Sequence, residues 1–192
     1  MVNQLKKMDL HELNQAYQKV LIWFFSFPSR EIGLNDLSHA VKISKTSAKE
    51  IVNKLEAEGF LKKEVIGRTW QISCDQNHAY NSSKKIAFNL AMIYESGILE
   101  KIKDIIPSQR AIILFGSYRK GDDDENSDID IAVEVLDDKE VRIIELGIIP
   151  QIGYRKNIKV NLHLFSRNKV DINLFANIAN GIVLQGFLEV KS

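Results

Sequence analysis

The chain has 192 residues, of which 45% are hydrophobic and 27% are charged, a composition that excludes a disordered or fibrous protein. Its longest apolar stretch, residues 20–27, is far shorter than the roughly 20 residues that cross a bilayer, so we expect no membrane partner. The first residues lack the order of a secretory signal, and Cys74 is the single cysteine. We therefore expect a cytoplasmic protein without an internal disulfide.

Charge is nearly balanced, with 26 Lys and Arg against 25 Asp and Glu. Residues 1–84 hold 12 basic and 9 acidic residues, a net charge of +3, whereas residues 85–192 hold 14 basic and 16 acidic residues, a net charge of −2. This excess of positive charge in the first part permits a nucleic-acid contact there but does not by itself predict one.

The first part of the chain predicts three helices and a β-hairpin. Apolar residues recur at steps of three and four over residues 10–27, which predicts a helix that Pro28 ends. A short second helix precedes a third, which Ser44 caps. Two short strands come next, over residues 60–66 and 69–73. Three helices and then a hairpin is the element order of a winged helix-turn-helix domain.

We assign this winged-helix domain to residues 1–75 and a second domain to residues 85–192, with the polar, aperiodic residues 76–84 as a linker. The second domain opens with a long predicted helix over residues 86–105. Strands and helices then alternate, so the expected fold class is α+β, with a mixed sheet in the second domain. The expected strands are residues 111–115, 128–135 and 158–165, and the expected further helices are residues 139–147 and 170–180.

A glycine-serine turn after a buried strand is the sharpest signal in the second domain. Gly116 and Ser117 come directly after the strand, and Arg119 and Lys120 are close behind them. Glycine lets the backbone approach a triphosphate closely, the Ser117 hydroxyl can bind a phosphate oxygen, and the two cations add positive charge nearby. A Gly-Ser pair alone is an ordinary turn, so the prediction of a phosphate site also requires metal-binding residues on the next strand.

Two aspartates, Asp128 and Asp130, open that next strand, and ten residues separate Ser117 from Asp128. Because side chains alternate along a strand, both carboxylates face the same side of the sheet. Such a pair repels itself unless a cation lies between its members, and magnesium is the cation expected there. The acidic residues 122–125 that precede the strand are expected to form a solvated loop.

This combination resembles the minimal nucleotidyltransferases, the MNT group of the DNA polymerase beta superfamily, in which Gly-Ser is followed after ten residues by Asp-any-Asp. The resemblance covers roughly residues 86–190. It implies that Gly116 and Ser117 hold a nucleoside triphosphate, with ATP the expected donor. It also implies that Asp128 and Asp130 bind two magnesium ions while a nucleoside monophosphate passes to an acceptor hydroxyl. Small members of the group resemble antitoxins that adenylylate a HEPN-type toxin, which makes such a toxin a candidate partner.

The chain departs from this family at the third carboxylate, which usually lies on a neighbouring strand and takes the proton from the attacking hydroxyl. Alternation along residues 158–165 places Asn161 and His163 on the face opposite the core, so Asn161 stands where an aspartate is expected. An amide coordinates a metal weakly and cannot accept that proton. His163 is the alternative base, although a histidine on a strand is more often a structural hydrogen-bonding residue.

The third helix and the turn of the hairpin carry the residues that suit contacts to DNA phosphates and base edges in a major groove. The alternative is that this lysine-rich helix face is simply solvated. Glu50 and Glu56 reduce its positive charge. The predicted DNA-binding residues are Lys45, Thr46, Ser47, Lys49, Asn53 and Lys54 on the helix and Arg68 at the turn.

The sequence supports two hypotheses of different classes. The first is a magnesium-dependent nucleotidyltransferase that its winged helix places on DNA or on a partner protein. The second is a transcriptional regulator whose nucleotidyltransferase-like domain has lost turnover and serves as a nucleotide sensor or a dimerisation unit, a reading that Asn161 favours. An aminoglycoside acceptor stays open as a third alternative. A homodimer is also open for any of these functions.

Overall fold

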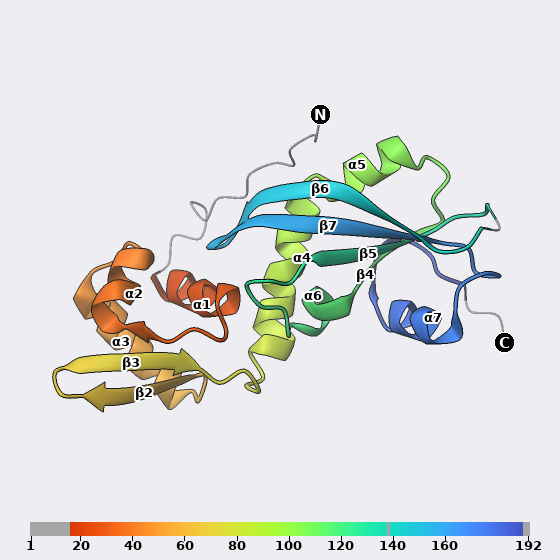
Figure 1. The fold of residues 1–192 in the computed structure, drawn as a ribbon. Coiled ribbons are helices and arrows are strands. Elements are labelled where there is room, and N and C mark those ends of the chain that lie inside the picture. The colour runs from red at the N-terminus through yellow and green to blue at the C-terminus, as the bar shows by residue number, and fades with distance from the viewer. Residues whose placement is uncertain (1–15, 138, 190–192) are drawn as a thin grey trace.

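The structure, a computed structural model, describes residues 16–137 and 139–189. Its first part contains three helices, α1 (Ala16–Ser26), α2 (Leu34–Ala40) and α3 (Lys45–Ala57). A short strand β1 (Ile32–Gly33) and the hairpin of β2 (Leu61–Ile66) and β3 (Thr69–Cys74) form a three-stranded antiparallel sheet in the order β1-β3-β2. The three helices and the hairpin that the sequence predicts are therefore present (Figure 1).

A separate apolar core holds these elements together. It is built mainly from the buried face of α1 with Leu37, Val52, Leu55 and Phe60, all of which are fully buried. The Ser44 side chain accepts a hydrogen bond from the backbone N–H of Ser47 and so caps α3, as predicted. Residues 10 and 13 of the predicted first helix lie outside the described residues.

Residues 75–85 run from the hairpin into the second part of the chain. A π-helical turn, η2 (Asn81–Lys85), leads directly into α4 (Ile86–Glu95). His78 and Tyr80 pack on Phe60, with ring centroids 5.7 and 5.5 Å away, and the Tyr80 hydroxyl donates to Glu58. This segment is thus fastened to the first core by side-chain contacts.

A five-stranded mixed sheet forms the second part, in the order β6-β7-β5-β4-β8. Only β5 and β7 pair in parallel, and the other neighbours are antiparallel. The strands are β4 (Ala111–Phe115), β5 (Ile129–Glu134), β6 (Arg142–Ile152), β7 (Arg155–Phe165) and β8 (Ile182–Gly186), and the helices are α4, α5 (Ile98–Ile105), α6 (Gly116–Lys120) and α7 (Ile172–Ala179). A mixed α+β fold is therefore confirmed.

The two faces of this sheet have different coverings. One face carries Ile112, Leu114, Ile131 and Val160 into a core with α4 and α5. The opposite face carries Phe115 and other apolar side chains into a smaller cluster with α7 at one end of the sheet (Figure 1). Polar side chains occupy the same face beyond this cluster, and these build the candidate site.

Two predicted helices differ from the structure. The sequence predicts a helix over residues 139–147, but most of them belong to the edge strand β6, because their β-branched Ile143 and Ile144 pair with the free edge of β7. The single long helix over residues 86–105 is instead α4 and α5, broken at Gly97. Gly97 adopts a φ of 79°, a left-handed conformation that ends α4.

Within the described ranges 16–137 and 139–189, no helix combines the length and apolar character needed to span a bilayer.

Candidate active site

The Gly-Ser turn lies at the end of β4, where the chain enters α6. Gly116 has a φ of 72°, in the region that favours glycine. A Cβ atom added to Gly116 would lie 3.1 Å from Oδ2 of Asp130. The turn therefore contacts this carboxylate directly, and only a residue without a side chain fits there without displacing it.

The aspartates lie where strand alternation predicts them. Ile129, Ile131 and Val133 are fully buried in the core with α4 and α5, so Asp130 projects from the opposite face of β5. Asp128 immediately precedes the strand and shares this parity. Both side chains are partly exposed, as a site that receives a ligand from solvent requires.

Strand β7 supplies a partner for each aspartate. The Asn161 Nδ2 atom lies 3.4 Å from Oδ2 of Asp128, and the His163 Nε2 atom lies 3.1 Å from Oδ1 of Asp130. The Phe115 ring meets the imidazole edge-on, with the ring centroids 4.9 Å apart. The parallel pairing of β5 and β7, with Asp130 opposite Asn161, produces this arrangement. The four polar side chains thus lie on one face beside the Gly-Ser turn.

The cations of the turn lie on α6. Arg119 is half-buried and Lys120 is exposed. Lys159, which sequence reasoning did not single out, is exposed on β7 two residues before Asn161 and therefore on the same face. Alternation along this strand is the signal in the sequence that could have identified Lys159. The three cations thus lie on α6 and β7, the two elements that contact β5 beside the aspartate pair.

The loop before Asp128, which the sequence predicts to be solvated, is so only in part, because Asp123 is 2% exposed whereas Asp122 is exposed. Its Oδ1 atom lies 3.3 Å from the Lys85 ammonium and accepts a hydrogen bond of 2.8 Å from Asn89. Its Oδ2 atom lies 3.6 Å from Arg155. Asp123 escapes prediction because its partners are 34 and 38 residues before it and 32 residues after it.

Burial is the main cause of the pKa shifts of Asp123 and Lys85. Desolvation raises the pKa of Asp123 and lowers that of Lys85, and in each case the opposite charge of the other residue acts against the shift. Both groups are therefore costly to leave without a partner.

Arg155 connects this buried cluster to the site. Its guanidinium donates to the Tyr118 hydroxyl at 2.7 Å and to the backbone carbonyl of Ser127, the residue directly before Asp128. Asn89 also donates to the Tyr118 carbonyl in α6 at 3.2 Å. The same buried cluster thus holds both the Gly-Ser helix and the approach to the first aspartate.

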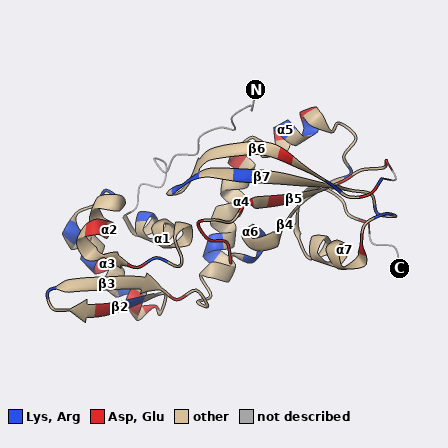
Figure 2. Cartoon of the chain, viewed as in Figure 1, with Lys and Arg blue, Asp and Glu red and all other residues tan. Residues whose placement is uncertain are grey.

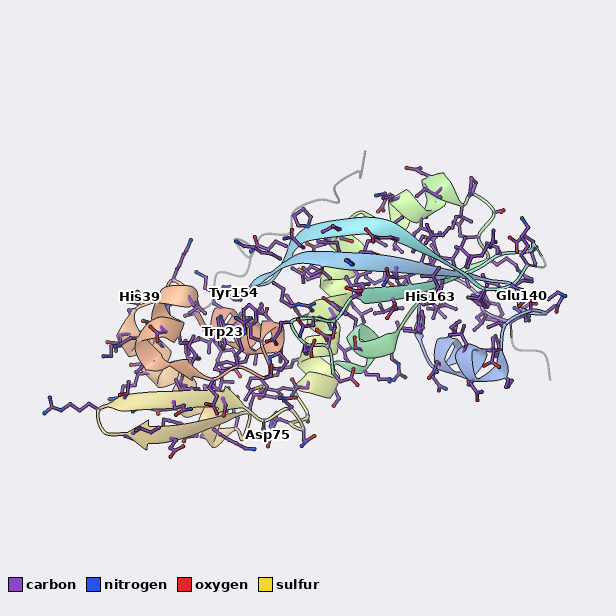
Figure 3. The ribbon with its side chains drawn as sticks, in the orientation of Figure 1. Trp23, His39, Asp75, Glu140, Tyr154 and His163 are labelled. Carbon is purple, nitrogen blue, oxygen red and sulfur yellow. The ribbon has the colours of Figure 1, made fainter. Side chains whose placement is uncertain are left out.

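The first part of the chain also contacts this loop. Ser29 and Arg30 donate to the Glu125 carboxylate at 3.0 and 3.2 Å. Tyr154, at the turn between β6 and β7, donates its backbone N–H to the Ser26 hydroxyl at 3.2 Å. Figure 3 shows Tyr154 beside α1. The two parts of the chain therefore meet at the segments that position the site.

A comparison with protein families finds a match in this region. Residues 95–179 match the nucleotidyltransferase domain. The matched stretch contains the Gly-Ser turn, both aspartates and the two polar residues of β7. It supports nucleotidyl transfer as the general activity of this part of the chain.

A search of curated proteins finds a shorter similarity. The chain is similar to the protein adenylyltransferase MntA of Shewanella oneidensis strain MR-1, with 44% identity over 48 residues. That stretch covers 25% of this chain and 34% of the relative. The chain thus matches about a third of the length of this relative. No solved structure matches the chain.

The carboxylates of the site suit a magnesium ion that protein and substrate bind jointly. Within residues 16–137 and 139–189, no three or more His, Cys, Asp and Glu side chains form a metal-binding group. Magnesium, however, is usually held by one or two carboxylates together with substrate phosphates and water. Asp128 and Asp130 supply such a pair, so the residues present fit the ion.

The residues predicted to bind DNA lie around α3 and the hairpin. Lys45, Lys49 and Arg68 are exposed and line a hollow of about 280 Å³, together with Trp70 and the acidic Asp36. Figure 2 shows the β2–β3 turn in the colour of basic residues.

The other predicted DNA-binding residues have more varied surroundings. Thr46 and Lys54 are exposed, and Lys54 lies 4.9 Å from the ring of Tyr17. Asn53 accepts a hydrogen bond from Lys63, and the Ser47 hydroxyl contacts that of Ser44 in the helix cap. The structure thus brings a basic surface together at Lys45, Lys49 and Arg68.

Proposed function

We propose that this chain is a magnesium-dependent nucleotidyltransferase that moves a nucleoside monophosphate from a nucleoside triphosphate to an acceptor hydroxyl. The contact between the Gly116 turn and the Asp130 carboxylate carries this proposal, because a turn suited to phosphate lies against one member of a carboxylate pair suited to magnesium. The match of residues 95–179 to the nucleotidyltransferase domain supports it.

Each residue has a role in this proposal. Gly116 and Ser117 hold the triphosphate, with Arg119 or Lys120 balancing its charge. Asp128 and Asp130 hold the metal. Bound magnesium supplies electrostatic stabilisation of the attacking and leaving oxygens. The acceptor oxygen forms a bond to the α-phosphorus, the bond from that phosphorus to the bridging oxygen breaks, and pyrophosphate leaves with the electron pair.

ATP is the expected donor, and a protein hydroxyl is the expected acceptor. The partial similarity to a protein adenylyltransferase supports both expectations. A HEPN-type toxin is the first acceptor to test, because the motif resembles that of antitoxins which adenylylate such toxins. A homodimer would be compatible with the same chemistry.

Incubation with each labelled nucleoside triphosphate, with and without magnesium, tests this function by pyrophosphate release and label transfer to an added toxin. We expect magnesium-dependent transfer from ATP that Asp130→Asn abolishes and that Asp104→Asn, an exposed change on α5, leaves intact. Transfer that continues in the Asp130→Asn variant would refute the assigned metal pair.

A second candidate function is a DNA-binding regulator whose nucleotidyltransferase domain senses nucleotides without turnover. Asn161 favours it, because an amide, 3.4 Å from Asp128, stands where the family presents a proton-accepting carboxylate. We propose that residues 1–75 act as the winged helix, with Lys45, Lys49 and Arg68 on DNA phosphates. ATP binding without pyrophosphate release, together with ATP-dependent DNA affinity in gel shifts, would favour this function over the first.

A further inference from the structure

Strand β7 carries no carboxylate at the candidate site. Asn161 carries an amide, which cannot take a proton from an attacking hydroxyl. The Nε2 atom of His163 is already engaged with Asp130 at 3.1 Å, and its ring is packed against Phe115. A carboxylate base for the proposed transfer therefore has to come from another strand.

The register of the sheet brings one further carboxylate to the same level. Phe115 of β4 pairs with Asp130 of β5, Asp130 pairs with Asn161 of β7, and Asn161 pairs with Glu145 of β6. These four residues form a continuous row across the sheet. Figure 2 shows acidic positions on both β5 and β6. Glu145 is thus the direct cross-strand neighbour of the amide that replaces the family carboxylate.

Cross-strand pairing indicates the face on which Glu145 lies. The next residue, Leu146, is 6% exposed and belongs to the core with α4 and α5, whereas Glu145 is exposed. Directly opposed residues of neighbouring strands share a face, so Glu145, which pairs with Asn161, lies on the face of Asn161. The register shifts between Glu145 and Gly147, and such bulges often occur beside active sites, where they redirect a side chain.

The row also has a suitable width. Directly opposed residues have Cβ atoms about 5 Å apart, and strands lie about 4.8 Å apart, so the backbones of Glu145 and Asp130 are separated by about 10 Å. Asn161 stands between them in the row, so an acceptor hydroxyl that reaches both carboxylates lies over Asn161 on the same face of the sheet. Within the described part of the chain, Glu145 makes no hydrogen bond or ion pair, so its carboxylate is available.

We propose that Glu145 is the catalytic base of the transfer, in place of the missing carboxylate at Asn161. This inference rests on the proposed nucleotidyltransferase function. The acceptor hydroxyl gives its proton to a Glu145 carboxylate oxygen as its own oxygen bonds to the α-phosphorus of the triphosphate. The bond to the bridging oxygen breaks, and pyrophosphate leaves with that electron pair. The acceptor therefore approaches from the exposed β6 edge of the sheet.

The test compares the parent chain with Glu145→Gln and with the matched control Glu64→Gln, which alters an exposed glutamate on β2. Two quantities are measured for each chain. The first is magnesium-dependent ATP binding by calorimetry, and the second is the single-turnover rate of label transfer from ATP to an added HEPN-type toxin. We expect Glu145→Gln to bind ATP like the parent but to transfer about 10²-fold or more slowly, the usual loss for a missing base. Glu64→Gln should match the parent in both.

A third variant, Asn161→Asp with Glu145→Gln, returns a carboxylate to the neighbouring position in the row. We expect it to recover much of the lost rate, because a carboxylate again stands beside the aspartate pair.

Parent-like transfer by Glu145→Gln would overturn the role of Glu145 and leave the proposed function standing. A parent that binds magnesium and ATP but does not transfer would also overturn it, while the nucleotide site stands. A parent that does not bind ATP at all would refute the proposed function itself.

Discussion

Replacing Asp123 by asparagine removes the negative charge at the centre of the buried cluster while keeping the size of the side chain. Lys85 and Arg155, 1% and 6% exposed, then retain buried positive charges without their carboxylate partner. Breaking a buried pair in this way costs about 3–5 kcal/mol. For a chain of this length, each kcal/mol lowers the melting temperature by about 2–4 °C, so we expect a decrease of about 6–20 °C.

Thermal denaturation followed by circular dichroism measures this decrease, with Asp122→Asn as the control because the neighbouring Asp122 is exposed. The double variant Asp123→Asn with Lys85→Met should recover part of the loss, since it removes one of the buried cations. If Asp123→Asn melts at the temperature of the Asp122→Asn control, the buried cluster does not stabilise the fold and its proposed positioning of Asp128 fails with it.

Three further predictions concern separate parts of the chain. Alanine at Lys45, Lys49 and Arg68 together should weaken DNA binding and reduce the slope of log affinity against log salt by about 2.7, at about 0.9 for each phosphate contact; equal gel shifts at every salt concentration would contradict this. Asn161→Asp should raise the transfer rate when magnesium is present. Without magnesium it should lower the free energy of unfolding by about 1 kcal/mol, because its carboxylate then lies beside that of Asp128. A melting temperature of this variant that magnesium does not change would refute the shared site. Burial raises the pKa of the Cys74 thiol to about 11, so iodoacetamide at pH 8.5 should modify it in urea but not in the folded protein, as mass spectrometry would show.

Local patterns predicted the part of the site that local geometry determines. The strand before Gly116, the turn itself and the shared face of Asp128 and Asp130 can be inferred from alternation over a few residues, and the structure has all of them. The parity of Asn161 and His163 was predicted in the same way. Each of these depends on neighbours within about ten residues, where spacing alone carries the information.

Contacts between distant segments could not be read from the same patterns. Asp123 looked like a member of a solvated acidic run, because nothing near it in sequence shows that Lys85 and Arg155 surround it. The segment with Ile143 and Glu145 contains helix formers and β-branched residues alike, and the free edge of β7 decided in favour of a strand. The row that joins Glu145 to Asn161 therefore became visible only with the register of the sheet.

The central claim is that the Gly116 turn and the two aspartates bind a nucleoside triphosphate together with magnesium. Isothermal titration of ATP into the parent chain, with magnesium or with EDTA, tests it most directly, beside Asp128→Asn, Asp130→Asn and the control Asp104→Asn. We predict saturable binding to the parent and to Asp104→Asn with magnesium, and loss of that binding with EDTA or in either site variant. Binding of equal strength in all four proteins, or binding that EDTA leaves unchanged, would contradict the account.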